Sequence, residues 1–293
     1  MAWQIASRLL IRTSTDPSIN QTIPMSAIDD LFKQLKSEGK KAFMPFVTAG
    51  DPSLEFTAEI LKSLDAKGCH LAELGIPYSD PIADGPVIQA SYTRALGGGT
   101  KLRNIFEMVS KVTPEIKMPI VSMVSYAIIY RMGVDEYLKQ AKAAGISGAI
   151  VPDMPVDESA ELAAKCKALD FSLIQLITPT TPRQRAIEIA QQTTGFIYYV
   201  SITGITGERT ELPTDLVDNL KWLKSQTDLP ICVGFGISQP EHAETLKPVC
   251  DGMIVGSAIV RRIAKATTDG VAAQDVIKDV GDFSGSMLAA ING

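Results

Sequence analysis

The chain has 293 residues, of which 45% are hydrophobic and 21% charged, and its formal net charge is -5. Neither sign of charge forms a long block, and nucleic acids or anionic membranes need concentrated positive charge, which disfavours both as main partners. No apolar run approaches the roughly 18 residues that a membrane span requires. We therefore expect neither a nucleic acid nor a membrane as a partner, and we expect a cytoplasmic location.

The cysteines and histidines give little support for a metal site or for a Cys/His nucleophile pair. The four cysteines lie far apart without a Cys-x-x-Cys pair, and Cys69, Cys166 and Cys232 lie in or beside apolar stretches. Such cysteines usually behave as small buried hydrophobic residues. His70 and His242 are isolated from each other and from cysteine. We therefore expect no metal ligands in this chain.

Residues 1–24 form an extension whose composition differs from the rest of the chain. They contain two arginines, one acidic residue and several Ser and Thr after a short apolar patch at 5–11. A weak targeting segment is one interpretation. We favour a disordered extension or a translation start at Met25, and we expect one catalytic domain over residues 25–293.

A regular pattern begins at Ser26. Ser26 and Asp29 have the spacing of a capping box, and an apolar helical face follows. Gly39 is a typical helix terminator. The pattern predicts a helix over residues 26–36 that precedes the first strand.

Eight short apolar runs then alternate with amphipathic helices, as expected for parallel strands that are buried on both faces. This pattern fits either a closed barrel or an open doubly wound sheet. The number of runs and the lack of an early Gly-x-Gly-x-x-Gly turn favour a (β/α)8 TIM barrel, with the first helix capping its bottom. Functional residues should then follow the carboxyl ends of the strands. The predicted strands are 42–48, 71–76, 119–125, 148–152, 172–177, 196–201, 230–234 and 252–255.

The second predicted strand carries an acidic residue, and a second acidic residue follows in the loop. Glu73 lies inside the apolar run 71–75. A carboxylate there is costly unless it is paired or protonated. Alternation along the strand directs Glu73 away from the side that Ala72 and Leu74 face, which suits the barrel lumen. The alternatives are a structural ion pair or a glutamate that burial neutralises. Asp84 alone is less specific because loop aspartates often cap turns.

Glycine-bearing turns follow the last two strands. The seventh ends in Gly234-Phe235-Gly236-Ile237-Ser238, and the eighth in Gly256-Ser257-Ala258. Barrels frequently bind phosphate at these two places, through backbone N–H groups and a helix N-terminus. The alternative is that these glycines only make tight turns.

Three further features are candidates for ligand contacts. The segment 202–213 is longer than a usual strand-to-helix connection, and its two glycines, Gly204 and Gly207, favour a lid. An irregular surface loop is the alternative. Tyr126, which we place at the end of the third strand, and Tyr198 in the sixth could line an aromatic pocket, although core packing is the default for either.

The segment 73–86, Glu-Leu-Gly-Ile-Pro-Tyr-Ser-Asp-Pro-Ile-Ala-Asp-Gly-Pro, resembles the signature of tryptophan synthase α subunits. Pro45–Pro52 is similar to their first strand and loop, and the later glycine motifs follow in the same order. The resemblance covers about residues 26–265. The extension has no family counterpart that we can place, and the tail from Thr267 resembles the family only weakly, which leaves the fold of both ends open.

The resemblance implies a retro-aldol cleavage of indole-3-glycerol phosphate to indole and glyceraldehyde 3-phosphate. Glu73 matches the general acid-base, and Asp84 matches the carboxylate that binds the indole N–H. The resemblance also implies a partner β subunit in an α2β2 complex, with pyridoxal phosphate on that partner and no cofactor on this chain. A stand-alone lyase and a non-catalytic phosphate-binding barrel are the alternatives.

The resemblance assigns the remaining contacts residue by residue. Thr206 matches the lid, and the other matched residues belong to the indole pocket or to the phosphate end. The implied substrate-binding residues are Phe46, Tyr126, Tyr198, Thr206, Gly207, Phe235, Gly236, Gly256 and Ser257.

Overall fold

The computed structural model describes residues 26–82, 84–201, 215–234 and 236–293. The predicted extension at 1–24 lies outside the described residues. So do Thr206, Gly207 and Phe235, together with the whole of the predicted lid at 202–213.

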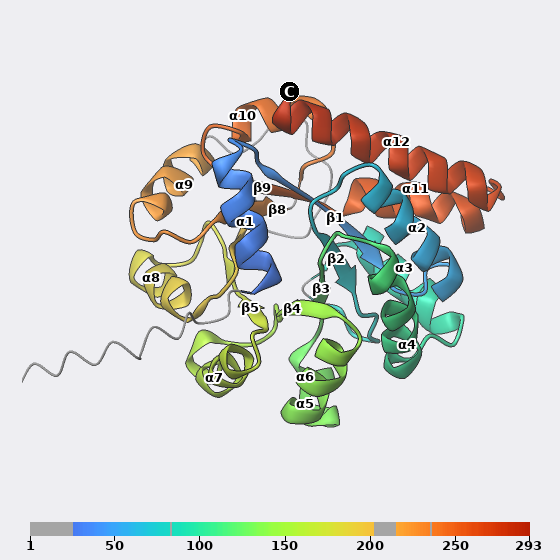
Figure 1. The fold of residues 1–293 in the computed structure, drawn as a ribbon, viewed down its shortest axis with the longest axis horizontal. Coiled ribbons are helices and arrows are strands. Elements are labelled where there is room, and N and C mark those ends of the chain that lie inside the picture. Colours follow the sequence, from blue (N-terminus) through green and yellow to red (C-terminus); the bar gives the residue numbers. More distant parts are fainter. Residues whose placement is uncertain (1–25, 83, 202–214, 235) are drawn as a thin grey trace, which may run out of the picture.

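The described residues form one sheet in which all neighbouring strands are parallel (Figure 1). Its order is β5-β4-β3-β2-β1-β9-β8-β7-β6, so the first strand in the chain pairs with the last. The strands are β1 (Ala42–Thr48), β2 (Ala72–Gly75), β3 (Ile120–Met123), β4 (Ile146–Ile150), β5 (Ser172–Ile174), β6 (Leu176–Ile177), β7 (Ile197–Val200), β8 (Ile231–Gly234) and β9 (Gly252–Val255).

The two ends of this order, β5 and β6, are separated in sequence only by Gln175. They are two pieces of one strand, of which the first pairs with β4 and the second with β7. The ring therefore has eight strands, and it is closed through the fifth strand in chain order, which is interrupted at one residue. The predicted (β/α)8 barrel is confirmed.

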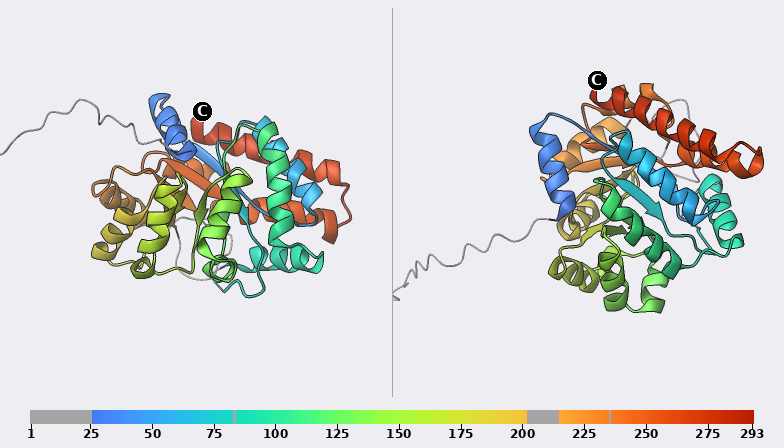
Figure 2. Two further views of the ribbon diagram at one scale, coloured as in Figure 1. Left: turned by 60° about the horizontal axis from the view of Figure 1, so that its bottom comes forward. Right: turned by 45° about the vertical axis from the view of Figure 1, so that its right-hand side comes forward.

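Helices surround the strands on the outside (Figures 1 and 2). The long last helix, α12, packs against α2, α10 and α11. The α-helices are α1 (Ala27–Ser37), α2 (Leu54–Ala66), α3 (Pro86–Gly97), α4 (Leu102–Val112), α5 (Tyr126–Met132), α6 (Val134–Ala143), α7 (Ala160–Ala168), α8 (Arg183–Gln192), α9 (Leu216–Lys224), α10 (Pro240–Leu246), α11 (Ser257–Thr268) and α12 (Ala273–Asn292); short 3-10 helices lie at Thr113–Glu115 and Val156–Glu158.

Helix α1 covers the bottom of the barrel, as predicted. The Ser26 side chain accepts a hydrogen bond from Asp29 N, and the Asp29 side chain accepts one from Ser26 N, which completes the capping box. The hydroxyls of Ser26 and Ser172 lie 3.0 Å apart, and the rings of Phe32 and Phe196 have centroids 5.6 Å apart. Because Ser172 and Phe196 lie at the amino ends of their strands, α1 closes the end opposite to the expected site.

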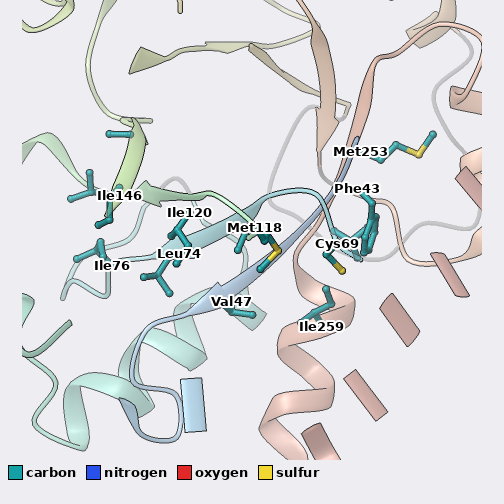
Figure 3. Close-up of a cluster of buried hydrophobic side chains, with 14 of the residues drawn as sticks. Phe43, Val47, Cys69, Leu74, Ile76, Met118, Ile120, Ile146, Met253 and Ile259 are labelled. Carbon is teal, nitrogen blue, oxygen red and sulfur yellow. The ribbon is translucent and has the colours of Figure 1, made fainter. Parts of the chain in front are cut away.

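Alternating side chains along each strand separate two apolar layers. Phe43 and Val47 of β1 face the helices, in the layer that Figure 3 shows, whereas Met44 and Phe46 face the lumen. Burying such a side chain is worth about 1.5–3 kcal/mol, so both layers stabilise the barrel. Leu74 belongs to the outer layer. Its neighbour Glu73 therefore faces inward.

One boundary was predicted wrongly. Tyr126 does not end the third strand, which stops at Met123; it is the first residue of α5. Asp153 accepts hydrogen bonds from Ser125 Oγ at 2.6 Å and from Tyr126 N at 2.8 Å. These bonds satisfy free donors at the start of a helix, so the chain turns there instead of extending the strand.

The tail that the resemblance left open is helical, and it packs closely on α2. A Cβ atom on Gly281 would lie 2.7 Å from Ser63 Oγ, so glycine permits this approach of α12. Within the part of the chain that the structure describes, no helix is both long and apolar enough to cross a membrane.

Candidate active site

A cavity opens at the carboxyl ends of the strands. The strand residues on its wall point into the lumen, and the remaining residues come from the loops and helix starts that follow β2, β8 and β9. The described residues that line it are Phe46, Glu73, Asp84, Ile88, Met123, Tyr198, Gly236, Ile237, Ser238, Ile254, Gly256, Ser257 and Ala258.

Glu73 is a buried carboxyl group to which the described residues offer no compensating partner. It pairs in register with Phe46 of β1 and Val121 of β3, and only 1% of it is exposed. Neither carboxyl oxygen has a hydrogen-bond partner among the described residues. Burial, and secondly the charge of Asp84, raises the pKa of Glu73 to about 8. Glu73 is therefore mostly protonated at neutral pH.

Asp84 lies at the base of the loop between β2 and α3. Its backbone N–H donates to Pro81 O at 3.1 Å, which closes a tight turn, and the residue is 6% exposed. Burial raises the pKa of Asp84 to about 6. Asp84 therefore loses its proton first, while Glu73 is still neutral, which explains why only Glu73 experiences its neighbour's charge. At neutral pH the pair is one anion and one acid.

The part of the cavity wall that follows β8 and β9 is suited to an anion. Gly256 precedes α11, so the first turn of a twelve-residue helix begins with Ser257 at the cavity wall. Gly236 has φ +73°, a conformation that glycine adopts without strain. Among the described lining residues none is a lysine or an arginine. Backbone N–H groups and the dipole of α11 can therefore attract an anion here without a cationic side chain.

The structure brings most of the predicted site together. Tyr126 is the exception among the described residues: it is half-buried, its ring lies 6.2 Å from that of Tyr130, and it is not part of the described cavity wall. Thr206, Gly207 and Phe235 lie outside the described residues. The predicted residues on the wall are Phe46, Glu73, Asp84, Tyr198, Gly236, Gly256 and Ser257.

Sequence reasoning missed several apolar lining residues. Met123 and Ile254 lie on strands, and the alternation that placed Glu73 in the lumen could have found them. Ile88 lies in the first turn of α3. No local sequence pattern predicts how this helix is rotated about its axis. Ile237 lies in the turn after β8, beside the predicted Gly236.

The cysteines are buried thiols, as predicted. Burial raises the pKa of both Cys69 and Cys166 to about 12, so neither is an effective nucleophile at neutral pH. Within the described ranges, no group of three or more His, Cys, Asp or Glu side chains is arranged to hold a metal ion.

A closed ring of parallel strands surrounded by helices, with a cavity at the carboxyl ends of the strands, defines the class of TIM-barrel enzymes. Residues 32–287 match the family described as tryptophan synthase alpha chain. The chain belongs to this family.

The relatives span almost the whole chain. The tryptophan synthase alpha chain of Rhodopirellula baltica is 52% identical over 276 residues, which cover 92% of this chain and 99% of the relative. The crystal structure of the alpha chain from Legionella pneumophila has a TM-score of 0.82 and 32% identity, covering 92% of this chain and 98% of that chain. A structure that describes mutual activation of the tryptophan synthase a2b2 complex from Pyrococcus furiosus has a TM-score of 0.79 and 38% identity. The match covers 85% of this chain and 99% of that chain.

Proposed function

We propose that this chain is a carbon–carbon lyase that cleaves indole-3-glycerol phosphate into indole and glyceraldehyde 3-phosphate. The observation that carries the proposal is the unpaired Glu73 carboxyl group, with its pKa near 8, which faces one pocket together with Asp84. Family membership supports the same reaction.

Glu73 performs both proton transfers. Its protonated form donates a proton to C3 of the indole ring and becomes a carboxylate. That carboxylate then takes the proton from the hydroxyl on the carbon attached to C3. The bond between C3 and this carbon breaks, its electrons return to the ring, and the carbon becomes the aldehyde. Glu73 ends the cycle protonated, and general acid-base help of this kind is worth about 10²–10⁴ in rate.

Asp84 stabilises the charge that develops in between. Protonation at C3 places positive charge on the ring nitrogen, and an anionic carboxylate near that N–H offsets it. Because the site is buried, the attraction is stronger than in water. The raised pKa of Asp84, about 6, still leaves it ionised at neutral pH.

The indole ring and the phosphate need different surroundings, and the cavity offers both. Phe46, Ile88 and Ile254 supply apolar wall beside the carboxyl groups, whereas Gly256 and Ser257 supply backbone donors. A ligand with an aromatic head and an anionic tail can therefore contact both carboxyl groups and the start of α11.

We further propose that the chain assembles with a β subunit as an α2β2 complex, with pyridoxal phosphate on that partner. A groove of about 990 Å³ runs beside the loop after β2 and along α5. Ile82, which lines it, is 84% exposed, and Tyr130 on α5 is 75% exposed. Exposed apolar side chains around a groove are typical of a protein interface.

The cytoplasmic location stays a prediction.

The test is an indole-release assay on the wild type and on Glu73→Gln. Indole release by the wild type, and its loss in the variant, supports the lyase; no release by the wild type, alone or with a β subunit, supports a non-catalytic barrel. Size-exclusion chromatography with a β subunit separates the assembly from a stand-alone lyase. Co-elution and a gain in activity on mixing are expected.

A further inference from the structure

The position of Asp84 depends on α3, because the helix begins two residues after it. Among the described contacts, Asp84 is held through its backbone: its N–H donates to Pro81 O, and its C=O accepts from the side chain of Gln89. Both bonds use backbone atoms, so they position the residue without using its carboxyl oxygens.

Gln89 holds both ends of the turn 81–84. Its Nε2 lies 2.7 Å from Asp84 O and 3.3 Å from Pro81 O. One amide group therefore donates to the first and the last residue of the turn. Gln89 itself is exposed, so its amide would be satisfied by water without this contact.

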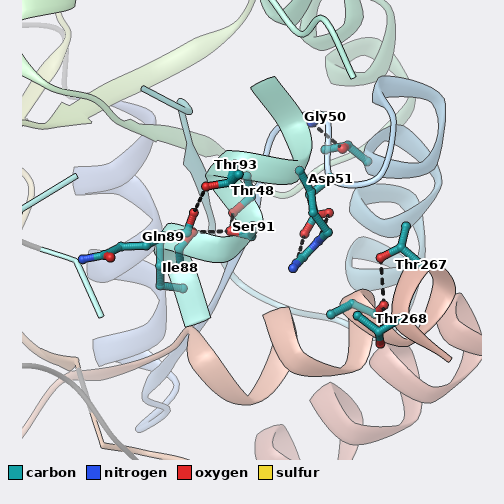
Figure 4. A network of polar contacts seen from close by, with 12 residues as sticks. Thr48, Gly50, Asp51, Ile88, Gln89, Ser91, Thr93, Thr267 and Thr268 are labelled. Atoms are coloured by element: carbon teal, nitrogen blue, oxygen red, sulfur yellow. Dashed lines mark hydrogen bonds and ion pairs between the residues drawn. The ribbon is translucent and has the colours of Figure 1, made fainter. Parts of the chain in front are cut away.

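Helix α3 is in turn fixed to the barrel by two polar links on one face (Figure 4). Ser91 Oγ donates to Ile88 O at 2.7 Å, which leaves Thr48 Oγ1 as the donor in its 2.6 Å contact with Ser91 Oγ. One turn later, Arg94 donates to both carboxyl oxygens of Asp51, at 2.8 and 2.7 Å. One link joins α3 to β1 and the other joins it to the loop after β1. The helix that carries Gln89 is therefore held against the barrel.

We propose that Gln89 is a positioning residue for Asp84. It ties the backbone of Pro81 and Asp84 to α3, so that the Asp84 carboxylate stays buried and directed at the indole nitrogen. This inference rests on the proposed lyase function and deepens it. The alternative is that Gln89 only stabilises the first turn of α3.

The test compares Gln89→Met, which keeps the length but removes the donors, with Gln89→Lys, which keeps N–H donors. Thr93→Val is the matched control, since Thr93 lies one turn along α3 and donates only to Gln89 O among the described residues. We expect kcat/KM for indole-3-glycerol phosphate to fall about 10-fold in Gln89→Met and to recover within about 3-fold in Gln89→Lys, because small displacements of a catalytic group are costly.

Two further readouts separate positioning from general stability. Burial raises the pKa of Asp84 to about 6, so a loosened turn should admit water and shift the acidic limb of the pH–rate profile downward in Gln89→Met. The inhibition constant of glycerol 3-phosphate, which probes the phosphate end, should stay within about 2-fold of the wild type.

Three outcomes would overturn the inference: unchanged kinetics in Gln89→Met, the same loss in Thr93→Val, or equal weakening of glycerol 3-phosphate binding. An inactive wild type would refute the lyase function itself. An active wild type with an unaffected Gln89→Met variant would refute the positioning role alone.

Discussion

Phe46 and Glu73 are register partners in the parallel pair β1–β2, so an aromatic ring lies beside the carboxyl group on the inner wall. Phe46 cannot hydrogen-bond to a carboxylate, and the described residues supply no other partner for Glu73. This pairing favours the protonated form of Glu73 by withholding solvation from its charge. The protonation state that the proposed reaction needs is thus set by strand register.

Replacement of Glu73 by Gln should abolish most turnover. The amide has nearly the same shape, but it neither donates an acidic proton to the ring nor accepts one from the hydroxyl. We expect kcat to fall by about 10²–10⁴, with substrate affinity within a few-fold of the wild type. Indole release and calorimetric titration with indole-3-glycerol phosphate measure the two quantities. A near-wild-type kcat would show that another group transfers the proton.

The pH dependence of kcat/KM should be bell-shaped. The active free enzyme has Asp84 ionised and Glu73 protonated, so activity should rise as pH passes about 6 and fall as it passes about 8. Initial rates at low substrate concentration from pH 5 to pH 9 provide the measurement.

Asp84→Asn is the control for that profile. It should lower the rate at every pH and remove the acidic limb, because the group that titrates there is gone, while the basic limb remains. If the acidic limb persists in this variant, the assignment of that limb to Asp84 is incorrect.

The free energy of unfolding should also depend on pH, because of the raised pKa of the Glu73 carboxyl group. Its pKa rises from 4.5 when exposed to about 8 in the fold, so between these values the folded state binds more protons than the unfolded state. The free energy of unfolding should therefore decrease with rising pH across this window and level off above pH 8. At about 1.4 kcal/mol per pKa unit, the decrease is a few kcal/mol.

Urea denaturation of the wild type and Glu73→Gln at pH 5 and pH 8.5 measures this effect. The variant lacks the buried acid, so its stability relative to the wild type should be greater at pH 8.5 than at pH 5. An equal difference at both values would mean that Glu73 does not carry the raised pKa.

The sequence was sufficient for the barrel because its signals are local. Each strand is a short apolar run, the capping box at Ser26 requires only neighbours, and alternation alone directs Glu73 inward. The interruption of the fifth strand at Gln175 and the helical start at Tyr126 were missed. The start at Tyr126 has a local signal, because Ser125 is the N-cap and its Oγ accepts from Ala127 N. It also depends on Asp153, a partner from a different loop.

The candidate site shows the same division. Glu73, Gly236 and Gly256 were found because strand position and glycine turns mark them in the sequence. Ile88 and Gln89 were not found, since both depend on how α3 is rotated against β1. That rotation is fixed by pairs such as Thr48–Ser91, whose members are 43 residues apart.

The buried ion pair between Asp51 and Arg94 provides a prediction about stability. The Asp51 side chain is 1% exposed and that of Arg94 is 24% exposed. Arg94→Met should leave a buried carboxylate without its partner and reduce the free energy of unfolding by about 3 kcal/mol. This value is the lower end of the range for buried ion pairs, because the guanidinium is partly solvated. Urea denaturation at pH 7 measures the change.

Two controls separate this pair from surface charge. Lys111, whose side chain is 72% exposed and paired with Glu107, should tolerate the same change to Met without a measurable loss. The double variant Asp51→Asn/Arg94→Met should recover part of the loss, because the unpaired charge is removed along with its partner. If Arg94→Met proves as stable as Lys111→Met, water must reach Asp51, and the polar link does not hold α3 in place.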